Sequence, residues 1–145
     1  SLIPLNYSIE LWNYINDLNC NTLNTIDENY NSTKKLVKII ANLKKDEKTL
    51  IGYGATAKFT NVMNMCGLNN KHIDYVLDTT PLKNNKWIPN TNVQIKAYSP
   101  KNVKDIDYFY LGAWNYKSEV IRKESQFIQN GGKFITHIPK VTILK

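Results

Sequence analysis

Hydrophobic side chains in the first third of the chain recur at helical spacing, and two such stripes are present. The first predicts a short amphipathic helix over residues 8–19. The second predicts a longer helix over 25–45, because it begins at a capping box, Thr25-Ile26-Asp27-Glu28, and ends in Lys44 and Lys45. Residues 1–47 are therefore expected to form a helical lead-in.

From residue 49 onward, short apolar runs alternate with helical stripes. Strands are expected at 49–51, 73–77, 93–97, 106–113 and 134–138, with an edge strand at 141–144. Helices are expected over 58–66 and from an Asn115 cap to Gly131-Gly132, and a polar loop over 79–92. Short alternating strands and helices are typical of an α/β domain. We expect residues 48–145 to form a Rossmann-like, three-layer domain with a mostly parallel sheet.

Length and composition favour one globular domain. The chain has 145 residues, of which 42% are hydrophobic, and no apolar run approaches the roughly 18–20 residues of a membrane span. The start, Ser-Leu-Ile-Pro, lacks a signal-peptide pattern, which favours an internal fragment or a processed chain. Cys20 and Cys66 offer no disulfide framework and, with two histidines, no metal-ligand spacing, so we expect a cytoplasmic protein without a metal.

The net charge of +7 comes almost entirely from lysine, since Arg122 is the sole arginine. The lysines are spread along the chain and do not form a stripe interleaved with aromatic residues. Proteins that recognise nucleic acids usually concentrate arginine and aromatic residues on one face. The composition therefore argues against a nucleic-acid partner and leaves a weak preference for anionic ligands.

The most informative motif is Gly52-x-Gly54-x-x-Ala57, which lies between the expected strand at 49–51 and the expected helix at 58–66. In such a turn Gly52 permits the tight bend, Gly54 lets a ligand approach the backbone, and Ala57 lets helix and strand pack closely. Backbone N–H groups at the helix start favour a phosphate or carboxylate. The alternative is that the two glycines only make a turn.

Four other residues lie near the carboxyl ends of expected strands, where such sheets bind ligands. Asp78 suits a ribose hydroxyl, or it caps a turn before Pro81. Lys58, in the first helical turn, contacts an anion or is merely solvated. Trp114 stacks on a ligand or packs under the loops, and Asn115 is at least a helix cap. No catalytic constellation stands out, because neither histidine has a partner that the sequence reveals.

The turn Gly52-Tyr53-Gly54-Ala55-Thr56-Ala57-Lys58 resembles the GYGAsaK turn in the C-terminal domain of sugar C-methyltransferases. The similarity covers about residues 30–145. Further segments that match in order are Ile73 to Asp78, Pro81-Leu82-Lys83, Lys86-Trp87-Ile88-Pro89, Asp107-Tyr108, Ala113-Trp114-Asn115, Glu119-Val120, Gly131 to Ile135 and Ile138-Pro139. The resemblance implies a fragment of an S-adenosylmethionine-dependent enzyme that acts on nucleotide-linked deoxysugars by proton abstraction and methyl transfer.

The resemblance also implies a division of labour. The nucleotide-linked sugar lies between this domain and a central S-adenosylmethionine-binding methyltransferase domain, in cis or in trans, and the methyl donor belongs to that other domain. The family's acid/base residues lie in a Glu-His segment, and no Glu-His pair occurs here. The family's PGthIPV loop is also altered, to residues 89–95. No catalytic residue and no cofactor are therefore assigned to this chain.

Together these arguments predict the substrate-side domain of a sugar C-methyltransferase. The expected substrate-binding residues are Gly52, Tyr53, Gly54, Ala55, Thr56, Ala57, Lys58, Asp78, Lys83, Trp114 and Asn115. Two alternatives remain at this point. The chain is a non-catalytic interaction module of the same fold, or a small Rossmann-type dinucleotide binder.

Overall fold

The computed structural model describes residues 23–137 and 140–145, so the helix expected over 8–19 lies outside the described residues. The long helix expected over 25–45 is confirmed as α2 (Leu23–Lys45). The later helices are α3 (Ala57–Met65), α4 (Lys117–Lys123) and α5 (Ser125–Gln129), with 3-10 turns η1 (Pro81–Lys83), η2 (Pro100–Val103) and η3 (Trp114–Tyr116).

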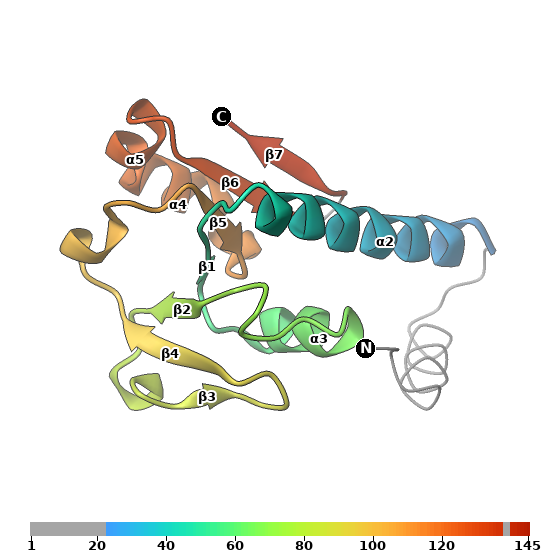
Figure 1. Ribbon diagram of the computed structural model, residues 1–145, viewed down its shortest axis with the longest axis horizontal. Helices are drawn as coiled ribbons and strands as arrows, with labels where there is room; N and C mark the ends of the chain where they lie inside the picture. The colour runs from blue at the N-terminus through green and yellow to red at the C-terminus, as the bar shows by residue number, and fades with distance from the viewer. Residues whose placement is uncertain (1–22, 138–139) are drawn as a thin grey trace.

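The described residues form one seven-stranded sheet in the order β3-β4-β2-β1-β5-β6-β7 (Figure 1). Its strands are β1 (Leu50–Tyr53), β2 (Tyr75–Asp78), β3 (Trp87–Ile88), β4 (Val93–Ala97), β5 (Tyr108–Leu111), β6 (Lys133–Thr136) and β7 (Thr142–Leu144). The five inner strands run parallel, and the edge strands β3 and β7 pair antiparallel with their neighbours. The predicted α/β fold with a mostly parallel sheet is confirmed.

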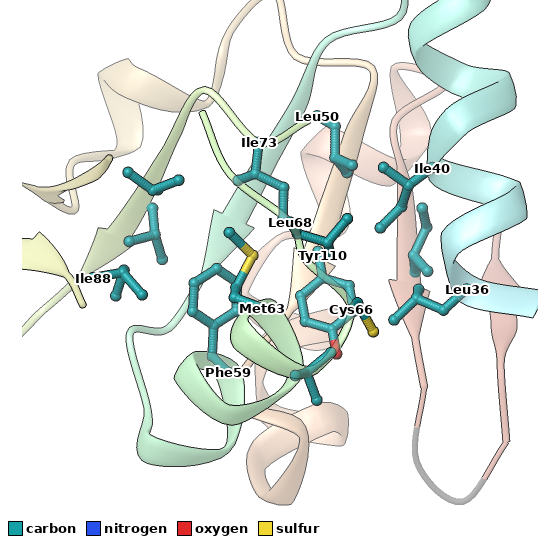
Figure 2. Close-up of a cluster of buried hydrophobic side chains, with 14 of the residues drawn as sticks. Leu36, Ile40, Leu50, Phe59, Met63, Cys66, Leu68, Ile73, Ile88 and Tyr110 are labelled. Carbon is teal, nitrogen blue, oxygen red and sulfur yellow. The ribbon is translucent and has the colours of Figure 1, made fainter. Parts of the chain in front are cut away.

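Successive side chains of β1 point to opposite faces of the sheet, and each face is covered by a hydrophobic core. Leu50 faces α2 and α3, and packs in a cluster with Leu36 and Ile40 of α2 and Phe59 of α3 (Figure 2). Ile51 faces the other way, into a second cluster with residues of β5, β6, α4 and α5. The molecule thus has three layers, with α2 against the same face as α3, as the hydrophobic stripes predict.

Three expectations about local structure are corrected. The polar segment 79–92 contains η1 and the two-residue strand β3, which is too short to leave a periodic pattern. The strand expected over 106–113 is limited to Tyr108–Leu111. Asn115 is not a helix cap, because it lies inside η3 and the residue before α4 makes no side-chain cap.

Candidate functional site

The candidate site lies at the point in the sheet where the order in which successive strands are added changes direction. From β1 the chain continues to β2 and β4 on one side, and β5 and β6 lie on the other. In open α/β sheets, ligands bind in the crevice outside the carboxyl ends of the strands at such a point. Here that crevice is bordered by the segments that follow β1, β2 and β5.

The turn after β1 is held by the neighbouring strands. The backbone N–H of Gly54 donates to the carbonyl oxygen of Leu77 at 2.8 Å. Gly54 has a φ of +90°, and a Cβ at this position would lie 2.7 Å from the Cβ of Ala113, which follows β5. The close approach that requires glycine is therefore to Ala113.

The assumed roles of Gly52 and Ala57 are wrong. Gly52 is buried within β1, and a Cβ there would lie 2.8 Å from the ring of Phe59, so this glycine lets α3 pack on the strand. Ala57 is exposed and takes no part in that packing. We expected Ala57 to allow the close contact between helix and strand, but Gly52 allows it.

Thr56 joins the turn to β5 and starts α3. Its hydroxyl Oγ1 accepts a hydrogen bond from the N–H of Phe59 at 3.1 Å, as an N-cap, and donates to the carbonyl oxygen of Gly112 at 2.9 Å. Both bonds are within the chain, so the side chain of Thr56 braces the rim of the crevice.

The carboxylate of Asp78 is engaged on three sides. Oδ2 accepts from the N–H of Ala55 at 2.8 Å and lies 3.4 Å from Nζ of Lys83, while Oδ1 accepts from the N–H of Thr80 at 2.8 Å. Burial works to raise the pKa of Asp78, but the hydrogen bonds from Thr80 and Ala55 and the charge of Lys83 outweigh it and lower the pKa. Asp78 is an ionised brace between the two turns.

A cavity of about 270 Å³ lies over these turns. The segments after β1 and β2 contribute hydroxyl and charged groups to its lining, from Thr56, Asp78, Thr79, Thr80 and Lys83. The rest is formed by Tyr53, Gly54, Leu77, Tyr98, Ala113 and, from η3 and α4, Tyr116, Glu119, Val120 and Lys123. The structure thus brings five expected residues to one cavity: Tyr53, Gly54, Thr56, Asp78 and Lys83.

The other expected residues lie apart from the cavity wall. Nζ of Lys58 lies 4.1 Å from the ring centroid of Trp114, a cation–π contact outside the cavity. Trp114 is half-buried and packs against the second core cluster, whereas Asn115 is exposed. Ala55 is buried, and its N–H and carbonyl oxygen bond to Asp78 and Lys83.

Sequence reasoning missed a buried acid beneath the cavity. Glu124, between α4 and α5, is only 5% exposed, and its Oε1 accepts from the hydroxyls of Tyr53 at 2.8 Å and Tyr98 at 2.5 Å. Burial first, and then the bond to Glu124, raise the pKa of Tyr98 to about 12 and that of Tyr53 further. The three side chains come from distant parts of the chain, so no local motif reveals them.

Cys66 and His137 do not line the cavity. Cys66 is buried, as its place on an apolar helix face predicts, and burial raises its pKa to about 12. His137 is buried with Nδ1 at 3.5 Å from the hydroxyl of Tyr110, and burial lowers its pKa. Among residues 23–137 and 140–145, no group of three or more potential metal ligands occurs, and no helix is long and apolar enough to span a bilayer.

Comparison with known proteins now identifies the domain. Residues 19–139 match the family model described as the C-methyltransferase C-terminal domain. The C-methyltransferase NovU of Streptomyces niveus is 37% identical over 109 residues, which cover 74% of this chain and 26% of NovU. The chain thus spans about a quarter of the length of that relative. It belongs to the family of C-methyltransferase C-terminal domains.

Proposed function

We propose that this chain is the substrate-side domain of a sugar C-methyltransferase and binds a nucleotide-linked sugar. The observation that carries the proposal is the cavity over the turns after β1, β2 and β5, in a chain of this family. Its lining combines aromatic rings with two lysines, Lys83 and Lys123, and two carboxylates, Asp78 and Glu119, of which Asp78 pairs with Lys83. The rings suit the aromatic part of such a ligand, and Lys123, which has no ion-pair partner among the described residues, suits its negative charge.

The size of the cavity supports a shared site. At about 270 Å³ it lies below the range of about 300–1,000 Å³ that is common for complete ligand pockets. A nucleotide-linked sugar is larger than this space, so only part of it fits here. We propose that an S-adenosylmethionine-binding methyltransferase domain, in cis or in trans, covers the remainder.

The hydrogen bonds of the crevice argue against a dinucleotide or S-adenosylmethionine in this domain. Both ligands are commonly bound by an acidic residue that accepts from ribose hydroxyls and by N–H groups of a glycine-rich turn. Here Asp78 and the N–H groups of Gly54 and Ala55 are already paired with each other or with the chain. S-adenosylmethionine would supply the methyl group from the partner domain.

Calorimetry on the 145-residue chain tests the proposal directly. UDP-glucose and dTDP-glucose serve as probes for the nucleotide-linked sugar, and S-adenosylmethionine and NAD as competitors of the other two classes. We expect binding of at least one sugar nucleotide and none of the competitors at the same concentration. Preferential binding of NAD would replace the proposal by a dinucleotide binder, and binding of none would favour an interaction module.

The isolated chain should transfer no methyl group. It carries no Glu-His segment, and the donor is assigned to another domain. The measurement is incubation with radiolabelled S-adenosylmethionine and a sugar nucleotide, with scintillation counting of the sugar product. Turnover above a boiled-protein control contradicts the proposed division between domains.

A further inference from the structure

The two lysines at the cavity differ in their partners. Nζ of Lys83 donates to the carbonyl oxygen of Ala55 at 2.9 Å and lies 3.4 Å from Oδ2 of Asp78, so its charge is compensated. Nζ of Lys123 lies 3.8 Å from the ring centroid of Tyr98. Within the described part of the chain, no carboxylate lies at ion-pairing distance from Lys123, not even Glu119 one turn earlier on α4.

The ring under Lys123 is itself fixed. The hydroxyl of Tyr98 donates to Oε1 of the buried Glu124, which also accepts from Tyr53 on the central strand. The rings of Tyr53 and Tyr98 pack edge to face, with centroids 5.8 Å apart and planes at 62°. The tyrosine after β4 is thereby tied to the helix pair α4–α5 across the cavity, and its face is held beneath the ammonium.

A cation–π contact leaves an ammonium able to bind an anion. The ring attracts the charge through its quadrupole but accepts no conventional hydrogen bond, so within the described residues the N–H donors of Lys123 that point away from the ring stay available. Tyr53, Leu77 and Val120 line the same cavity with apolar surface. Because Lys123 is itself exposed, its attraction for a phosphate is that of a partly screened surface charge and depends on salt.

We infer that Lys123 is the residue of this domain that binds a phosphate of the ligand, and that Tyr98 and Glu124 are its positioning residues. The inference rests on the proposed function and deepens it, since it assigns the negatively charged part of the nucleotide-linked sugar to the α4 side of the cavity. The glycine turn, whose N–H groups at Gly54 and Ala55 are engaged, then borders the ligand without carrying its charge.

The first experiment compares Lys123→Met with a matched control, Lys96→Met. Lys96 is also an exposed lysine over a tyrosine, with Nζ 4.1 Å from the ring centroid of Tyr75, but it does not line the cavity. Calorimetry uses UDP-glucose and inorganic pyrophosphate at low and high salt. We expect Lys123→Met to weaken both probes about fivefold, the size of a partly exposed charged contact. Its affinity should also vary less with salt, while Lys96→Met matches the parent chain.

The second experiment tests the positioning residues. Tyr98→Phe keeps the ring under Lys123 and loses the bond to Glu124, whereas Tyr98→Leu loses both. We expect affinity for UDP-glucose to fall in the order parent, Tyr98→Phe, Tyr98→Leu, with the salt dependence of Tyr98→Phe unchanged. In Glu124→Gln, the pKa of Tyr98 should be lower than in the parent chain, because burial still raises it but the hydrogen bond to the Glu124 carboxylate and its charge no longer do. Ultraviolet absorbance titration of each chain beside its Tyr98→Phe counterpart isolates this one of the nine tyrosines.

Each outcome separates the inference from the function on which it rests. If the parent chain binds pyrophosphate but no sugar nucleotide, the proposed function fails; a loss in Lys123→Met alone would still support Lys123 as the anion site. If the parent chain binds UDP-glucose and Lys123→Met binds equally well, the inference is overturned and the proposed function stands. Equal losses in Lys123→Met and Lys96→Met also overturn it, as does binding of neither probe by the parent chain.

Discussion

Replacing Gly54 by alanine separates the structural role of the glycine turn from a role in ligand binding. The residue has a φ of +90°, and an added Cβ would lie 2.7 Å from the Cβ and 3.0 Å from the N atom of Ala113. Two costs follow, one from the backbone conformation and one from the contact. Gly131 provides a matched control, because its φ is +92° and an added Cβ would have nothing within 4 Å.

The two costs can be given magnitudes. An L-residue in the left-handed region costs about 1–2 kcal/mol, and this applies to Gly54→Ala and Gly131→Ala alike. Overpacking against a fixed neighbour costs about 1–3 kcal/mol more, and only Gly54→Ala meets one. The lower entropy of the unfolded alanine chains acts equally in both variants and cancels in the comparison. Gly54→Ala should therefore unfold about 1–3 kcal/mol more easily than Gly131→Ala.

Urea denaturation followed by circular dichroism measures both free energies of unfolding. If Gly54→Ala is no less stable than Gly131→Ala, the contact between the turn and Ala113 does not exist in solution and our account of the motif fails. The bulkier Gly54→Val would be a poor test of ligand binding. A loss of binding in that variant would not be separable from a loss of folding, since its added Cβ would lie 2.7 Å from the Cβ of Ala113.

Three further predictions follow from hydrogen bonds and pKa directions. Asp78→Asn should lower the free energy of unfolding by about 1–3 kcal/mol in urea melts, since it removes a buried charge-assisted acceptor. For Asp78, whose pKa is lowered, the stabilisation is present above pH 3.8 and is lost as pH falls through the folded value, so Asp78→Asn should flatten acid unfolding. Thr56→Ala should cost about 1–2 kcal/mol, and Thr56→Ser much less, by thermal melts. Burial lowers the pKa of His137, so its contribution to stability is present above pH 6.5 and is lost as pH falls through the folded value; nuclear magnetic resonance titration should find a midpoint below 6.5.

Much of the fold follows from periodicity that is local in the sequence. The stripe of Leu36, Ile40 and Leu43 is spaced for one helix face, and all three side chains are buried. The apolar run around Phe109 and Tyr110 marks a strand buried on both faces. The two-residue strand β3 was not predicted, because it forms by pairing with β4, and local propensity contains no information about such a partner.

The candidate site was harder to predict, for a different reason. A Gly-x-Gly-x-x-Ala turn and an acidic residue after the next strand have the spacing of a nucleotide site. The same spacing also lets Asp78 reach the N–H of Ala55, and a sequence does not show which partner the carboxylate takes. No local sequence pattern predicts the hydrogen bonds of Glu124, because its two tyrosine partners lie 26 and 71 residues away along the chain.

The bonds of Asp78 shift attention from the glycine turn to α4. A carboxylate that holds Ala55, Thr80 and Lys83 stabilises the rim of the crevice through contacts within the chain itself. A side chain that holds two turns together cannot be replaced to suit a different ligand without weakening those turns. Lys123 and Tyr116, by contrast, are exposed side chains at the same cavity, and Tyr116 is 63% accessible. If the proposed function holds, differences in ligand preference between domains of this family should therefore be sought on the η3–α4 side before the glycine turn.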